Sequence, residues 1–163
     1  IKSIANPDYV RVAVWRDPVE RVVSWYRDKV ISDDNVYTRR LGLTIDTDWD
    51  RIIDFLQFEL GKSDPEWIDE HLRPQARHFT ADNIDVAVEL RDLNDYLGAI
   101  GAHVPPKRRR NATAKKGDDP SEEQLQQIRD LYAEDYQLRE QIAHKFWSKE
   151  QEDAAALAAT LTV

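Results

Sequence analysis

Residues 9–30 read YVRVAVWRDPVERVVSWYRDKV and change from the two-residue period of a strand to the spacing of a helix. Valines alternate through the first part, and residues 12–15 are apolar on both faces, which is typical of an interior strand. Asp17 and Pro18 then stop the strand and can begin a helix, with Glu20 completing an Asp-x-x-Glu capping box. The stretch therefore predicts a strand, a turn and a helix in direct succession.

The rest of the chain predicts one further strand and several helices. The predicted elements are, in order, a helix at 48–60 ended by Gly61, a strand at 84–90, a helix at 92–100 ended by Gly101, a helix opened by a capping box at 119–122, and a helix at 136–147. Residues 33–46 and 62–80 are expected to be turn-like or irregular. Alternation of strand and helix favours an α/β fold with a parallel sheet flanked by helices and a helical C-terminal part.

Composition narrows the class of protein. The chain has 163 residues and one domain is expected over residues 1–163. Its 31 acidic and 23 basic residues give a net charge of −8, which argues against a nucleic-acid or anionic-membrane binder. No apolar run approaches the roughly 18 residues of a membrane span. The chain has no Cys, which excludes a thiolate zinc site, and no metal is expected. The absence of Cys also fits a cytoplasmic location.

A candidate phosphate site follows the first strand. Arg16 stands at the C-terminal end of that strand, where open α/β sheets bind ligands, and a helix N-terminus with free N–H groups comes next. Arg21 and Ser24 are three residues apart and so share one helix face. An arginine fork and a hydroxyl near a helix start suit a phosphate. The alternative is that Arg16 pairs with a surface acid and Ser24 is merely solvated.

The order of residues in 16–29, Arg-Asp-Pro-x-x-Arg-x-x-Ser-x-Tyr-x-x-Lys, resembles the 3′-phosphate-binding motif of sulfotransferases, most of all the carbohydrate branch related to chondroitin and dermatan enzymes. Segments 70–75, 88–93 and 131–136 resemble later parts of the same family, so the similarity spans about residues 9–146. The resemblance implies a P-loop-like sulfotransferase fold. It also implies that Arg16 and Ser24, with Arg21 beside them, bind 3′-phosphoadenosine 5′-phosphosulfate (PAPS).

A basic run provides a second candidate contact. Residues 105–117 hold six positive charges and no negative one. Lys115, Lys116 and Gly117 resemble the loop that closes over PAPS in related enzymes, and clustered cations with a glycine suit a phosphate that backbone approaches closely. The alternative is a solvated charge run.

His71 is the predicted catalytic residue. Sulfuryl transfer to a hydroxyl needs a base to take up the proton, and histidine titrates in the right range. The alternatives are a structural histidine bonded to backbone, or Glu70 as the base.

One departure from the family pattern concerns the 5′-phosphosulfate. The family begins with a strand and a phosphate-cradling loop that normally carries a catalytic lysine, and nothing before Tyr9 fits this description. The domain is therefore expected to be incomplete at its N-terminus. The sequence predicts PAPS-dependent sulfation of a carbohydrate or similar hydroxyl acceptor. The alternatives are a non-catalytic anion-, glycan- or nucleotide-binding module with only the 3′-phosphate half-site, and a nucleotide kinase, against which the missing Walker loop counts.

Overall fold

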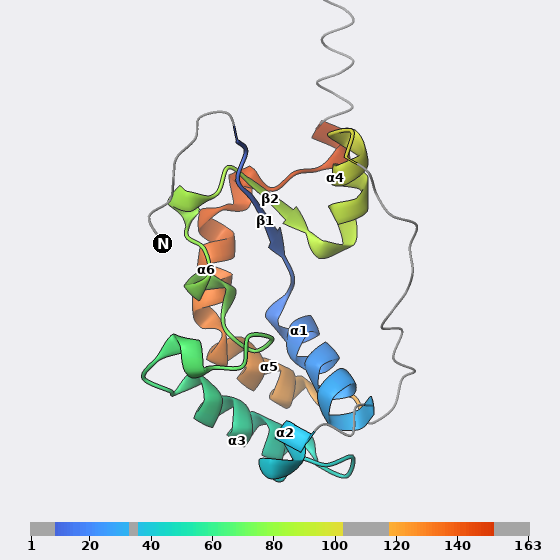
Figure 1. Ribbon diagram of the computed structural model, residues 1–163, viewed down its shortest axis with the longest axis vertical. Helices are drawn as coiled ribbons and strands as arrows, with labels where there is room; N and C mark the ends of the chain where they lie inside the picture. Colours follow the sequence, from blue (N-terminus) through green and yellow to red (C-terminus); the bar gives the residue numbers. More distant parts are fainter. Residues whose placement is uncertain (1–8, 33–35, 103–117, 152–163) are drawn as a thin grey trace, which may run out of the picture. The chain divides into compact units, whose positions relative to one another are not determined.

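The computed structural model describes residues 9–32, 36–102 and 118–151. The chain divides into two compact units, each of which is built from separate stretches of sequence (Figure 1). The first unit comprises Ile1–Arg16, Phe79–Pro106 and Leu138–Val163, and the second comprises Asp17–His78 and Lys107–Gln137. Of the described helices, none is long and apolar enough to cross a membrane.

A small parallel sheet organises the first unit. Strand β1 (Val12–Trp15) lies beside strand β2 (Val86–Glu89), with Val12 opposite Val86 and Trp15 opposite Glu89. The face of β1 that carries Ala13 and Trp15 is buried, as expected from large apolar side chains packed between layers. Both predicted strands are therefore confirmed, each shorter than its sequence pattern, and their parallel pairing agrees with the predicted α/β class. The expectation that both faces of β1 are covered is wrong among the described residues, because Val12 and Val14 are each 40% exposed.

Helix α4 (Leu93–Ala99) follows β2 through the short 3₁₀ turn η5 (Leu90–Asp92) and packs on that strand (Figure 1). The chain leaves α4 through Gly101, whose φ of +70° lies in the left-handed region that glycine adopts without a steric penalty. Another short turn, η4 (Ala81–Asn83), precedes β2 and is closed by a Thr80–Asn83 capping box. The predicted helix at 92–100 and its glycine stop are confirmed.

The C-terminal segment differs from its prediction. A continuous helix was expected over 136–147, but helix α6 (Ala133–Gln141) ends early, the 3₁₀ turn η6 (Ala143–Lys145) follows, and Phe146 is extended beside Ala87 of β2. The Trp147 N–H donates to the Ala87 carbonyl at 2.8 Å. Packing of the half-buried Phe146 and Trp147 beside the sheet outweighs the weak helical preference of these residues, because that preference amounts to fractions of a kcal/mol per residue.

Helices form the second unit. They are α1 (Pro18–Trp25), the π-helical segment η1 (Tyr26–Ser32), α2 (Val36–Arg40), α3 (Trp49–Leu60), the 3₁₀ turns η2 (Pro65–Trp67) and η3 (Gln75–Arg77), and α5 (Glu122–Leu131). Both α1 and α3 pack on α5, and the core between them includes Ile52, Leu56 and Ile128, all fully buried. Helix α2 lies in a stretch that the sequence predicts to be turn-like, and that prediction is wrong there.

Caps decide where three of these helices begin. The Asp17 side chain accepts from the Glu20 N–H at 3.2 Å, as the sequence pattern predicts. The Asp48 side chain likewise accepts from the Arg51 N–H at 2.9 Å. At α5 the predicted cap is wrong. The cap is Ser121, in a reciprocal capping box with Gln124, while the carboxylate of Asp119 forms an ion pair with Arg27.

Candidate active site

Strand β1 places Arg16 at the carboxyl edge of the sheet. Arg16 is the residue after Trp15, which lies opposite Glu89 at the end of β2. Arg16 itself is half-buried. The two parallel strands therefore end side by side, at the edge where open α/β sheets bind ligands.

The start of α1 is not a vacant anion site. Asp17 Oδ1 accepts from the Glu20 N–H, and Asp17 Oδ2 accepts from the Tyr136 hydroxyl at 3.1 Å. Burial, and then the neighbouring Asp17 carboxylate, raise the pKa of that hydroxyl above its usual range. A carboxylate thus already interacts with the positive end of the helix dipole. The sequence predicted free N–H groups here, and of these the Glu20 N–H is bonded to the Asp17 side chain.

The three described residues predicted to bind the phosphate belong to different units of the chain. Arg16 belongs to the first unit, whereas Arg21 and Ser24 belong to the second. Ser24 is half-buried on the second turn of α1. The guanidinium of Arg21 donates to the carbonyls of His71 and Arg73 at 3.2 and 2.8 Å, and it lies 3.6 Å from the carboxylate of Asp135. Arg21 therefore interacts with the loop that carries His71.

His71 has the geometry of an oriented base. Its backbone N–H donates to Asp69 Oδ1 at 2.8 Å, and its ring Nδ1 lies 3.0 Å from the same oxygen. An ionised carboxylate only accepts, so a neutral His71 ring carries its proton on Nδ1 and keeps an acceptor lone pair on Nε2. The side chain is 52% exposed, which leaves it accessible to an acceptor. Glu70, the competing base, is also exposed.

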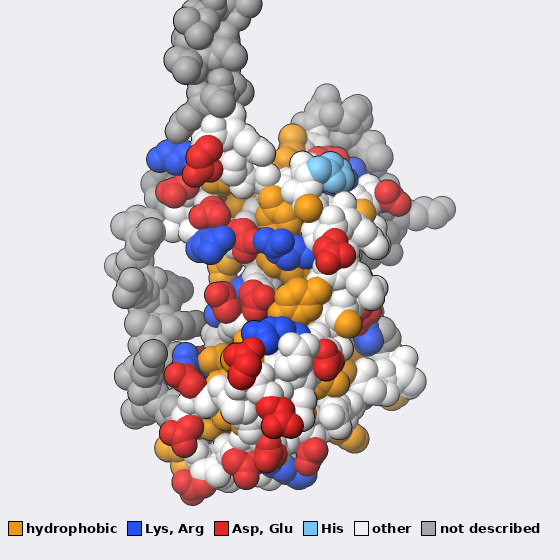
Figure 2. Space-filling model, turned by 180° about the vertical axis from the view of Figure 1, so that it is seen from behind, with side chains coloured by type: hydrophobic (Ala, Val, Ile, Leu, Met, Phe, Trp, Pro, Cys, Tyr) orange, Lys and Arg blue, Asp and Glu red, His pale blue; other side chains and the backbone are white. Residues whose placement is uncertain are grey.

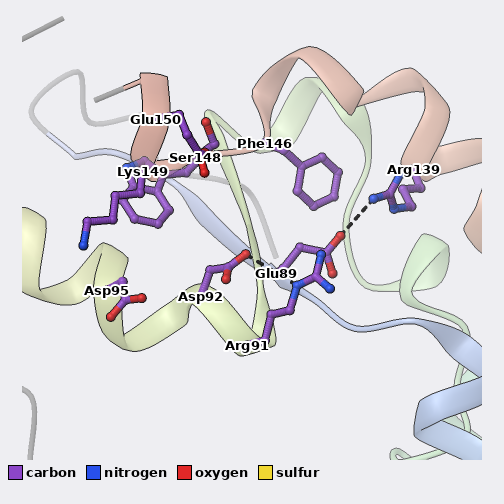
Figure 3. Close-up of a pocket in the computed structure, with 10 residues that line it drawn as sticks. Glu89, Arg91, Asp92, Asp95, Arg139, Phe146, Ser148, Lys149 and Glu150 are labelled. Atoms are coloured by element: carbon purple, nitrogen blue, oxygen red, sulfur yellow. Dashed lines mark hydrogen bonds and ion pairs between the residues drawn. The ribbon is translucent and has the colours of Figure 1, made fainter. Parts of the chain in front are cut away.

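A cavity of about 450 Å³ opens beside the end of β2 in the first unit (Figure 3). Arg139 forms an ion pair with Glu89 at 2.9 Å and lies over the ring of Phe146, 5.0 Å from its centre. Arg91 and Asp92 form a looser pair at 3.7 Å on the same rim. The sequence analysis assigned no binding role to Arg91 or Arg139. The sequence shows only that Glu89 lies at the end of a strand. It could not show that Arg139 lies at the same cavity, because the two residues are brought together by the tertiary fold.

Charges of both signs are mixed over the visible surface. On the face in Figure 2, acidic and basic side chains are interspersed with hydrophobic ones. Anion recognition on that face therefore depends on individual cations more than on a broad basic field. Lys115, Lys116 and Gly117, predicted to close over PAPS, lie outside the described residues.

The fold shifts the pKa of His78. Partial burial and the positive charges of Arg73 and Arg21 lower its pKa, while Asp135 and Glu70 act in the opposite sense. No group of three metal-ligating side chains occurs among the residues that the structure describes.

This shift predicts a pH dependence of stability. A histidine whose pKa is lower in the folded state takes up its proton first in the unfolded chain. The free energy of unfolding should then fall as the pH drops below about 6.5, the ordinary histidine pKa, and level off below the folded-state pKa. NMR titration of the His78 ring in the folded chain and in urea would measure both values. Equal midpoints in the two states, or an unchanged pH profile in His78→Gln, would contradict the prediction.

Comparison with known proteins gave one result. The family model described as "Sulfotransferase family" matches residues 1–139, which include β1, α1, the His71 loop and α5. No curated protein and no solved structure matched the chain significantly.

Proposed function

Because the chain belongs to the sulfotransferase family, we propose that it takes part in transfer of a sulfuryl group from PAPS to a hydroxyl of a carbohydrate or similar acceptor. The observation that carries the proposal is the family match over residues 1–139, within which Arg16 directly follows the carboxyl end of β1. The carbohydrate branch related to chondroitin and dermatan enzymes is the one that the motif at 16–29 resembles.

Two described residues fit the 3′-phosphate of the donor chemically. Arg16 offers a permanent cation with several N–H donors, and Ser24 offers one hydroxyl. Both are half-buried, so part of each side chain is accessible to a ligand while its motion is restricted. Because Asp17 caps α1, we assign phosphate recognition to these side chains and not to the helix terminus. Lys115, Lys116 and Gly117 are the proposed closing contacts.

His71 is the proposed general base. Its Nε2 would take the proton of the acceptor hydroxyl as that oxygen bonds to sulfur. The bond between sulfur and the 5′-phosphate oxygen breaks in the same step, and adenosine 3′,5′-bisphosphate leaves. Asp69 holds the ring in the required tautomer through the 3.0 Å contact at Nδ1. The other contributions expected are positioning and stabilisation of charge on the sulfuryl oxygens.

Binding of adenosine 3′,5′-bisphosphate tests the assignment of Arg16. Arg16→Ala should weaken binding by about 1.5–3 kcal/mol, because a hydrogen bond to a charged group is lost, and Ser24→Ala by about 0.5–1.5 kcal/mol. Calorimetric titration measures both losses. Arg51→Ala, at an exposed position of α3, is the matched control and should bind as the unaltered chain does.

Two results would count against the proposal. Equal affinity of Arg16→Ala and Arg51→Ala would remove the phosphate site. A protein that binds the bisphosphate but transfers no sulfate to hydroxyl acceptors would favour the non-catalytic binding module.

A further inference from the structure

The loop that carries His71 is held by the burial of Leu72 in the core and by a series of hydrogen bonds to its backbone. Three successive carbonyls accept side-chain donors: His71 and Arg73 from Arg21, at 3.2 and 2.8 Å, and Leu72 from the Tyr132 hydroxyl at 2.7 Å. The Ala76 N–H donates to Asp135 Oδ1 at 2.8 Å. These hydrogen bonds use no side chain of the loop. They fix the path of the backbone over residues 71–76 without occupying the ring of His71.

Side chains from α1, from α6 and from the residue after α5 provide these contacts. Arg21 lies on α1, while Asp135 lies in the part of α6 that belongs to the second unit. The Asp135 side chain is fully buried, and that of Arg21 is 14% exposed. Tyr132, which follows α5, is also buried, and burial raises the pKa of its hydroxyl far above the physiological range. Its O–H therefore stays protonated and remains a donor to the Leu72 carbonyl.

The charge on Arg21 is already balanced. Asp135 Oδ2 accepts no hydrogen bond from the described residues, and Arg21 Nη1 is 3.6 Å away. A buried carboxylate needs such a partner, because burial of an unpaired charge is strongly unfavourable. One guanidinium nitrogen thus donates to two carbonyls and another faces the carboxylate. Binding of a phosphate by Arg21 would compete with all three interactions.

We propose that Arg21 is a positioning residue for His71 and not a ligand of the nucleotide. Together with Asp135 and Tyr132 it presets the loop, so that His71 projects from a fixed backbone. The role of His71 as base rests on the function proposed above. The hydrogen bonds from Arg21 to the loop carbonyls do not depend on that function. Arg21 therefore has a different role from Arg16 and Ser24, although all three residues belong to the same sequence motif.

The test replaces the Arg21–Asp135 ion pair by two uncharged side chains and compares this variant with the unaltered chain. The double variant Arg21→Gln/Asp135→Asn removes both charges and keeps an amide oxygen at position 135 that can accept from Ala76. Hydrogen exchange of residues 71–76 should become about tenfold faster. The dissociation constant for adenosine 3′,5′-bisphosphate should stay within about twofold, while Arg16→Ala loses at least about tenfold in affinity. Peptides from α3 should exchange as before and serve as the internal control.

Arg21→Lys provides a second variant, because it keeps the charge opposite Asp135 and should fold. A lysine nitrogen cannot reproduce the planar fork, so the loop should still loosen. In a sulfate-transfer assay this variant should lower kcat by about ten- to hundredfold and leave KM for PAPS unchanged, since misplacement of a base slows chemistry more than donor binding. A defect in folding alone would lower the active fraction without loosening residues 71–76 selectively.

Loop exchange equal to that of the unaltered chain, or loss of bisphosphate affinity as large as that of Arg16→Ala, would overturn the inference. If the unaltered chain does not bind the bisphosphate, the proposed function fails. The exchange measurement still decides in that case whether Arg21 holds the loop.

Discussion

Arg21→Ala is expected to lower the free energy of unfolding by about 3–5 kcal/mol, because it leaves the buried Asp135 carboxylate without its cation. It also removes the donor to two loop carbonyls, at 3.2 and 2.8 Å. Urea denaturation followed by tryptophan fluorescence measures the loss, since buried Trp25 and Trp49 lie in the same core. A change of this size is a large part of the stability of an ordinary domain.

Arg77→Ala is the matched control for this prediction. Arg77 also forms an ion pair with a residue of α6, Glu134, at 3.0 Å, but those side chains are 29% and 43% exposed. An exposed pair of this kind contributes about 0–1 kcal/mol. Adding Asp135→Ala to Arg21→Ala should restore part of the loss, because the unpaired charge disappears. Equal effects of the Arg77 and Arg21 variants would contradict the buried-pair argument.

Phe55→Ala is expected to cost about 3–5 kcal/mol in the free energy of unfolding, the range for loss of a buried aromatic side chain. Phe55 is 7% exposed and stacks on Trp25 with ring centres 5.5 Å apart and planes inclined by 8°. Removing the ring leaves a cavity between α1 and α3. It also removes an aromatic pair worth about 0.5–1.5 kcal/mol beyond area burial.

The same helix supplies the control. Phe58 follows Phe55 by three residues on α3 but is 65% exposed, and Lys62 Nζ lies 5.8 Å from the centre of its ring. Phe58→Ala should change stability by no more than about 0.5 kcal/mol. Chemical denaturation of both variants decides the point. Similar losses for the two phenylalanines would show that the burial pattern of α3 is misassigned.

The sequence predicted those features of the fold that depend on contacts within a few residues. The Asp17 cap joins residues three apart, and the apolar face of α3 repeats with the helical period. Hydrophobic alternation likewise located β1 and β2, although their ends shortened. Local competition explains the error at α5, because Asp119 and Ser121 both fit a capping pattern and only the partner Arg27 distinguishes them.

Among the candidate site residues, the motif located Arg16 at the end of a strand and Ser24 on the following helix, and the structure agrees on both positions. It could not identify the partners of Arg21. The carbonyls that Arg21 binds lie 50 and 52 residues further along the chain, and helical spacing shows only that Arg21 and Ser24 share a face. Which group lies opposite a polar face is decided by how the helices pack.

The end of the chain illustrates the same division. Residues 142–147 have helical spacing of apolar side chains, yet Phe146 is extended beside Ala87 and Trp147 packs edge-on against Tyr96. Local pattern and propensity therefore located the strand–turn–helix unit and the starts of α1, α3 and α4, because those depend on bonds between near neighbours. The tertiary structure alone decided the ion pair of Arg21 with Asp135, the hold on the His71 loop and the place of Phe146. These depend on burial and on partners far apart in sequence, for which a local window carries no signal.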